Sequence, residues 1–123
     1  MSLPVHPLTG QRVGYARISS ASQNLDGQLD ALNAAGCEKI FSDTASGKLT
    51  ERPELTLCLG YLRARDTLVV WRLDRLGRSL RHLVETVNAL AERGVAFASL
   101  HEGIDTTTST GRLIFHIFAA LAE

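Results

Sequence analysis

The sequence contains no apolar run close to the ~20 residues that a membrane-spanning helix needs, and its N-terminus lacks the basic-then-apolar pattern of a secretory signal. The only two cysteines, Cys37 and Cys58, lie in apolar surroundings. Disulfide frameworks use more cysteines in a smaller core, so we expect two free, buried thiols. These absences argue against a membrane or secreted protein and favour a cytoplasmic one.

Motifs for several common chemistries are also missing. The four histidines are scattered without the spacing of metal ligands, so we expect no catalytic metal and no other cofactor. There is no Gly-x-Ser-x-Gly elbow of a triad hydrolase. The Gly-rich turn of a P-loop or a dinucleotide site is absent too. Metal-dependent hydrolysis, triad hydrolysis and nucleotide binding are therefore disfavoured.

Positive charge is not in excess, but it is concentrated. The sequence has 13 basic and 13 acidic residues, and a net charge of zero argues weakly against nucleic-acid binding. Nearly all the basic residues are arginines, and the segment 71–78 (Trp-Arg-Leu-Asp-Arg-Leu-Gly-Arg) holds three of them beside Asp74. Because arginine binds phosphate through paired N–H groups, this segment indicates an anionic ligand. For Arg63, Arg65 and Arg81, the alternative interpretation is that they are charges on solvated helix faces.

Apolar periodicity predicts strands that alternate with helices. Strands are expected at 12–18, 39–42, 67–71 and 95–100, and helices at about 25–35, 53–62, 79–93 and from 109 onward. The strand at 67–71 is almost entirely apolar, as expected for a strand covered on both faces. The helix at 53–62 is expected to be largely buried. The segments 43–52 and 101–110 are polar and predict loops, the first of them mobile.

This alternation predicts an α/β fold with a mostly parallel sheet of four or five strands and helices on both faces. We expect a flexible leader over 1–11, a single domain over 12–108, and a helix over 109–123. In such sheets, ligand-binding loops converge at the carboxyl ends of the strands. That rule gathers on one rim the residues Arg17 and Ser19 and the segments 43–52, 72–78 and 101–110.

A strand-end serine among arginines is suited to attack on a phosphodiester. Transfer at phosphorus develops charge on the non-bridging oxygens, and arginines can stabilise that charge without a metal. Arg75 and Arg78 are three residues apart, so we expect them to share a face at the start of the next helix, whose N-terminus favours an anion. A structural network of arginine and aspartate gives a similar pattern, so spacing alone leaves both interpretations open.

Several groups of rim residues then occur together in the chain. They are Tyr15-Ala16-Arg17-Ile18-Ser19, Gln23, Leu25-Asp26, Gln28, Asp43-Thr44-Ala45-Ser46-Gly47, Arg52 and Leu73-Asp74-Arg75-Leu76-Gly77-Arg78. In this order they closely resemble the N-terminal catalytic domain of serine site-specific recombinases, the resolvase/invertase family. The resemblance extends over about residues 12–123, and the segment from Thr110 to Glu123 resembles the start of that family's long dimerisation helix.

The resemblance implies that Ser19 attacks a DNA phosphodiester to give a 5′-phosphoserine intermediate and a free 3′-hydroxyl. Strand exchange and religation would follow without ATP or metal. The matching phosphate-site residues are Arg17, Arg52, Asp74, Arg75 and Arg78, and the expected supporting residues are Tyr15, Gln23, Gln28 and Ser46. A purely structural partner of arginine is the alternative for Asp74, and Arg72 is expected to be a surface or DNA-backbone charge.

The resemblance also implies double-stranded crossover-site DNA as the partner, a homodimer that forms a tetramer in the active synapse, and a bacterial protein that is nucleoid-associated when bound to DNA. Family members usually continue the last helix and add a helix-turn-helix module, so we expect a helix that is cut short and a module that is absent. The apolar segment 113–121 predicts self-association. The alternatives are a catalytically silent dimerisation or regulatory module of the same fold and a phosphate-binding or phosphoester-hydrolysing protein.

Overall fold

A computed structural model describes residues 10–19, 25–45, 52–76 and 79–122. The strands are β1 (Arg12–Ser19), β2 (Lys39–Ala45), β3 (Thr67–Val70), β4 (Ala96–Ser99) and β5 (Ile104–Asp105). The helices are α1 (Leu25–Ala34), α2 (Pro53–Tyr61), α3 (Leu80–Glu92) and α4 (Ser109–Leu121), with a short 3₁₀ helix, η1 (Leu73–Arg75), between β3 and α3. Gln23, Ser46, Arg78 and residues 1–9 of the predicted leader lie outside the described residues.

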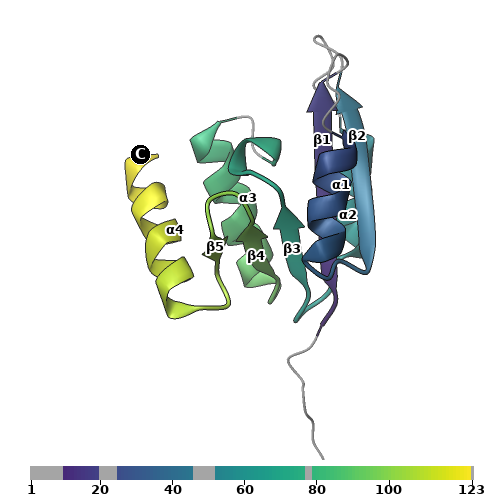
Figure 1. Cartoon of the computed structure of the whole chain (residues 1–123). Helices are drawn as coiled ribbons and strands as arrows, with labels where there is room; N and C mark the ends of the chain where they lie inside the picture. The colour runs from purple at the N-terminus through teal and green to yellow at the C-terminus, as the bar shows by residue number, and fades with distance from the viewer. Residues whose placement is uncertain (1–9, 20–24, 46–51, 77–78, 123) are drawn as a thin grey trace, which may run out of the picture.

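The five strands form one sheet in the order β2-β1-β3-β4-β5. The first four are parallel, and β5 pairs antiparallel with β4. Figure 1 shows the parallel strands ending at the same edge of the sheet, which is the upper edge in that view. The predicted mostly parallel α/β sheet is therefore confirmed.

Helices cover both faces of this sheet (Figure 1). On one face, Leu29 and Leu32 of α1 pack against a small apolar cluster that includes Val69 of β3. On the other face, α2 and α3 cover the larger core, which also includes Phe115 of α4. All four residues of β3 are buried, which explains why all of them except Thr67 are apolar. No helix in the described part of the chain is long and apolar enough to cross a membrane.

Helix boundaries follow local chemistry that the sequence indicates. Pro53 occupies the first turn of α2, where its missing N–H would have no intrahelical partner. The side chain of Ser79 accepts a hydrogen bond from the backbone N–H of His82 and caps α3. Gly36 and Gly94, which follow α1 and α3, adopt φ values of 89° and 79° that favour glycine.

Three predictions about local structure are wrong. The segment 43–52 was expected to be a loop from its first residue, but β2 continues to Ala45 because its backbone pairs with β1 as far as Ser19. The expected loop at 101–110 contains β5. Helix α2 is not largely buried, because Leu57 is 58% exposed and Tyr61 is 40% exposed.

The two cysteines are free, as predicted. Cys58 is fully buried in the larger core, whereas Cys37 is only partly buried beside α1. Burial raises the pKa of Cys58 to about 12 and that of Cys37 to about 11. Both thiols therefore stay protonated near neutral pH.

Candidate active site at the carboxyl edge of the sheet

The strand order reverses at β1, which lies between β2 and β3. The chain leaves β1 for β2 on one side, and it returns through α2 to β3 on the other side. At such a switch point the two connections diverge and leave a crevice outside the carboxyl ends of the strands. The end of β1 and the segment that follows β3 meet at this edge, where the sequence predicted the site.

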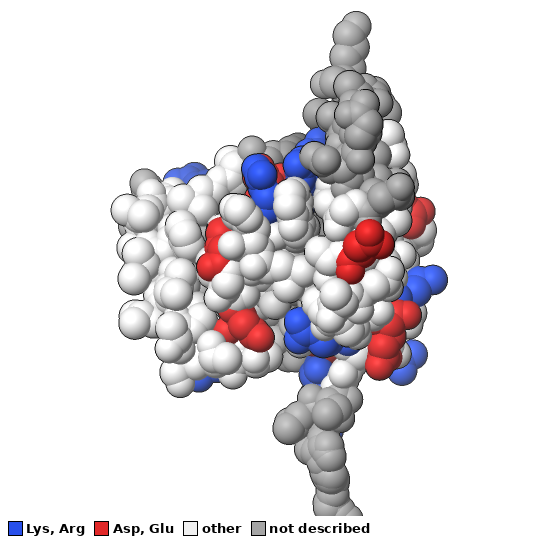
Figure 2. Space-filling view, in the orientation of Figure 1, with Lys and Arg blue, Asp and Glu red and all other residues white. Residues whose placement is uncertain are grey.

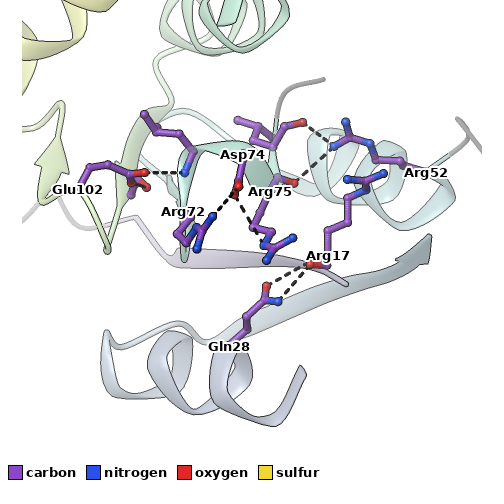
Figure 3. A network of polar contacts seen from close by, with 10 residues as sticks. Arg17, Gln28, Arg52, Arg72, Asp74, Arg75 and Glu102 are labelled. Atoms are coloured by element: carbon purple, nitrogen blue, oxygen red, sulfur yellow. Dashed lines mark hydrogen bonds and ion pairs between the residues drawn. The ribbon is translucent and has the colours of Figure 1, made fainter. Parts of the chain in front are cut away.

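Arg17 lies near the end of β1, and Gln28 of α1 holds its backbone. The side-chain oxygen of Gln28 accepts a hydrogen bond from the Arg17 N–H at 3.3 Å, and its Nε2 donates to the Arg17 carbonyl at 3.1 Å. Gln28 is only 1% exposed. The predicted supporting residue Gln28 therefore lies beside the site and contacts the Arg17 backbone (Figure 3).

Arg52 precedes α2 and is 8% exposed. Its Nη1 donates to the carbonyl of Leu76 at 2.5 Å and lies 3.5 Å from the carbonyl of Arg75. The same guanidinium keeps a second nitrogen, Nη2, that is buried and has no hydrogen-bond partner among the described residues. Arg52 therefore joins the start of α2 to the end of η1 and keeps one buried donor without a hydrogen bond to the described residues.

A buried carboxylate fixes the start of α2. Asp43 is 6% exposed and accepts hydrogen bonds from the Tyr15 hydroxyl at 2.8 Å and from the backbone N–H groups of Glu54 and Leu55 at 3.0 Å. Burial first, and then the Asp43 carboxylate, raise the pKa of Tyr15 above its usual range, so the hydroxyl remains a donor. Tyr15 and Asp43 thus support the helix that begins directly after Arg52.

The short helix η1 presents Asp74 and Arg75. Asp74 pairs with Arg72 at 2.8 Å, and its other oxygen lies 3.8 Å from Nε of Arg75. The hydrogen bond to Asp74 raises the pKa of Arg72, whose guanidinium also lies 5.4 Å from the centre of the Trp71 ring. The expectation that Arg75 begins the following long helix is wrong, because η1 ends at Arg75 and α3 begins at Leu80.

Three arginines at this edge have buried donor nitrogens with no hydrogen-bond partner among the described residues. These atoms are Nε of Arg17, Nη2 of Arg52 and Nε of Arg75. Figure 3 shows the three side chains close together beside Arg17 on β1, and Figure 2 shows basic residues along the upper edge. An unpaired buried N–H destabilises the folded protein by about 1–3 kcal/mol.

Ser19 is the last residue of β1, opposite Ala45 of β2 and two residues beyond Arg17. The description of Ser19 stops at its backbone. The structure therefore brings Arg17, Arg52, Asp74 and Arg75 to the strand end at which Ser19 lies. Among the described residues, no group of three or more His, Cys, Asp or Glu side chains could hold a metal ion.

A second hollow, of about 260 Å³, lies between α3, β4 and α4. Asn88, Phe115 and His116 are among its lining residues, and none of the three rim arginines lines it. Arg112, which also lines it, already donates to the Thr106 carbonyl at 3.0 Å. The three arginine donors without hydrogen bonds to the described residues therefore favour the strand-end edge as the functional site.

The site is thus the strand-end edge of a mostly parallel α/β sheet, where three arginine side chains gather beside the switch point (Figure 3). Residues 12–123 match the family described as "Resolvase, N terminal domain". This match covers most of the sequence, so the chain belongs to the resolvase family.

Similar proteins agree with this assignment. The chain is 56% identical to the transposon Tn552 resolvase of Staphylococcus aureus over 114 residues, which cover 91% of this chain and 58% of the relative. It is 57% identical to a DNA-invertase of Enterobacteria phage P7 over 111 residues, which cover 90% of this chain and 60% of the relative. The chain thus spans less than two thirds of the length of these relatives.

A solved structure shares the fold. The N-terminal catalytic domain of TP901-1 integrase superposes with a TM-score of 0.76 at 27% identity. The match covers 91% of this chain and 93% of that one. The fold described above is therefore shared with the catalytic domain of an integrase.

Proposed function

We propose that the chain is the catalytic domain of a site-specific DNA recombinase that cleaves and rejoins double-stranded DNA through Ser19. The observation that carries the proposal is the group of three buried arginine donors beside the strand that ends at Ser19, none of which has a hydrogen-bond partner among the described residues. Its relatives include a resolvase and a DNA-invertase, which supports DNA as the substrate.

In the proposed reaction, the Ser19 hydroxyl oxygen attacks the phosphorus in line and the bond from phosphorus to the 3′-oxygen breaks. The leaving 3′-oxygen gains a proton, the serine hydroxyl loses one, and the DNA 5′-phosphate becomes linked to serine. The phosphoester bond is conserved, so attack by a 3′-hydroxyl of another strand can reverse the step without ATP. Neither a metal nor another cofactor takes part in this proposal.

The arginines would stabilise the negative charge that develops on the non-bridging oxygens. Arg17, Arg52 and Arg75 each have a donor available for this role, and we include Arg78 as a fourth arginine. Asp74 would orient Arg72 and Arg75, which it contacts. Tyr15 and Gln28 would support the site through Asp43 and through the Arg17 backbone, and Gln23 and Ser46 complete the proposed supporting set.

The proposal includes a homodimer that forms a tetramer when two DNA sites come together in the cytoplasm of a bacterium. Leu113, Ile117 and Leu121 lie four residues apart on α4 and are 61%, 52% and 70% exposed. Residues with this spacing share one helix face. In Figure 2 the surface over α4 is largely free of charge, as expected for a face that a second copy covers.

The test is a covalent adduct on nicked duplexes whose central base pairs are randomised. A nick beside the cleaved bond lets the released strand diffuse away, so that the adduct accumulates. We expect an SDS-stable adduct, with mass spectrometry placing the phosphate on Ser19. It should disappear in Ser19→Ala and remain in Ser42→Ala, a control at an exposed serine of β2.

Two outcomes would contradict the proposal. An adduct that persists in Ser19→Ala would remove Ser19 as the nucleophile. No adduct with any sequence, under conditions in which the chain is assembled on DNA, would favour a catalytically silent dimerisation or regulatory module. Turnover of small phosphoesters without DNA cleavage would instead favour a phosphoester hydrolase.

A further inference from the structure

Glu102, in the turn after β4, links that turn to η1. One of its carboxylate oxygens accepts a hydrogen bond from the Ser99 hydroxyl, and the other accepts one from the backbone N–H of Leu73 at 3.3 Å. Ser99 is 1% exposed and belongs to β4. The carboxylate is therefore held by a buried residue of the sheet and reaches the first residue of η1 (Figure 3).

The contact compensates for a missing cap. The first N–H groups of a helix have no partner within it, and Arg72, which precedes η1, makes no side-chain capping bond. Within this turn, the N–H groups of Arg75 and Leu76 bond to the carbonyls of Arg72 and Leu73 at 3.0 and 3.1 Å. The N–H of Leu73 bonds instead to the carboxylate of Glu102, an exposed residue, at 3.3 Å, which is long for such a bond.

The turn is thereby held at both ends. Glu102 bonds to its first residue, and Arg52 bonds to the carbonyl of Leu76 just after its last residue. Between these two contacts lie Asp74 and Arg75, and the Nε of Arg75 is one of the three unpaired donors. The position of that donor relative to β1 therefore depends on Glu102 as well as on Arg52.

We propose that Glu102 is a positioning residue of the active site, which holds η1 so that Asp74 and Arg75 face the phosphate. The effect of this Glu102 contact on catalysis rests on the proposed function. Glu102 acts through the backbone of η1, and Ser99 orients its carboxylate. The residue is outside the set that the sequence motifs identified.

A functional test separates positioning from DNA binding. Adduct formation is measured in single turnovers over a range of DNA concentrations. Because a displacement of about 1 Å at a catalytic group can cost up to about 100-fold in rate, we expect Glu102→Ala to lower the saturating rate by about tenfold or more. The half-saturating DNA concentration should stay unchanged. Glu92→Ala, at an exposed glutamate in the last turn of α3, is the matched control and should leave both values unchanged.

Conservative variants sharpen the test. Glu102→Gln keeps one acceptor oxygen, so its rate should lie between those of the wild type and Glu102→Ala. Ser99→Ala removes the hydroxyl that orients the carboxylate, and we expect it to change the rate in the same direction. Combined with Glu102→Ala, it should add little further loss, because both changes break the same connection.

A structural measurement without DNA makes the outcomes distinguishable. Amide hydrogen exchange at Leu73 should accelerate in Glu102→Ala and not in Glu92→Ala, while exchange at Val69 in the sheet stays unchanged. Unchanged exchange at Leu73 would refute the anchor, and an unchanged saturating rate would refute its role in positioning. A wild-type chain that forms no adduct, with the Leu73 result as expected, would refute the proposed function and leave the anchor as a structural contact.

Discussion

Replacing Asp43 by alanine removes a carboxylate that joins β1 and β2 to the start of α2. The loss leaves three donors without their partner, namely the Tyr15 hydroxyl and the backbone N–H groups of Glu54 and Leu55. All three bonds lie at a site where the carboxylate is only 6% exposed. Water therefore cannot readily replace the carboxylate without a local rearrangement.

The size of the effect follows from these contacts. Loss of a side-chain cap at a helix start destabilises by about 0.5–2 kcal/mol, and a buried hydroxyl left without a partner adds about 1–3 kcal/mol. We therefore expect Asp43→Ala to lower the free energy of unfolding by about 3 kcal/mol. Tyr15→Phe leaves the carboxylate bonded to two backbone N–H groups, so it should cost only about 1 kcal/mol.

Urea denaturation monitored by circular dichroism provides the measurement, with midpoints compared at equal slopes. The double variant is the critical comparison. Once Asp43 is alanine, removing the Tyr15 hydroxyl also removes an unpaired buried group, so Tyr15→Phe should be neutral or stabilising in that background. If Tyr15→Phe costs the same in both backgrounds, the two groups are not coupled. If Asp43→Ala costs less than about 1 kcal/mol, the cap contributes less than we infer.

Burial raises the pKa of Cys58 from 9.0 to about 12. The stability that the buried thiol contributes is therefore present below about pH 9 and is lost as the pH rises toward the pKa of the folded protein. Cys58→Ala should reduce the decline of the urea midpoint at alkaline pH, and an unchanged decline would contradict this. Sulfate should raise the melting temperature more than chloride at equal ionic strength, because it is excluded from the protein surface and can also bind the arginine group in the folded state. Arg75→Gln should reduce that difference, whereas Arg63→Gln, at an exposed arginine, should keep it in full. Ile117→Glu should give a monomer in sedimentation velocity, whereas the control His116→Glu, at an exposed residue, should not. A wild-type chain that is already monomeric would refute the proposed interface.

Most of the fold could be predicted because its elements carry clear periods. The parallel strands and all four long helices follow from apolar spacing and from end signals such as Pro53, Ser79 and Gly94. The predictions failed in segments where the spacing of apolar residues does not indicate the structure. Strand β5 has only two residues, and α2 is apolar on nearly every side, so its sequence does not indicate that Leu57 is exposed.

The sequence was sufficient to predict which edge of the sheet carries the site. The strand-end rule places Arg17 and Arg75 together, although they are far apart in the chain, and the structure places them at one edge. The residues that hold them could not be assigned these roles. Asp43, Gln28 and Glu102 act by bonding to backbone groups between 11 and 29 residues away in sequence. Backbone groups are present at every residue, so no residue pattern indicates which of them a given side chain contacts.

These backbone contacts explain how the fold tolerates three cations in one small region. Each arginine is fixed by a different contact. Gln28 bonds to the backbone of Arg17, backbone carbonyls accept hydrogen bonds from the guanidinium of Arg52, and Glu102 holds the backbone of η1, which carries Arg75. Each arginine keeps one buried nitrogen without a hydrogen bond to the described residues, and a buried N–H without a partner is destabilising. In the proposed function, the same donors would be in place before the DNA arrives, so charge developing on the phosphate would be stabilised with little rearrangement. The sheet and its supporting polar contacts would thus hold the arginines in an arrangement that is unfavourable in the free protein and favourable once a phosphodiester is bound.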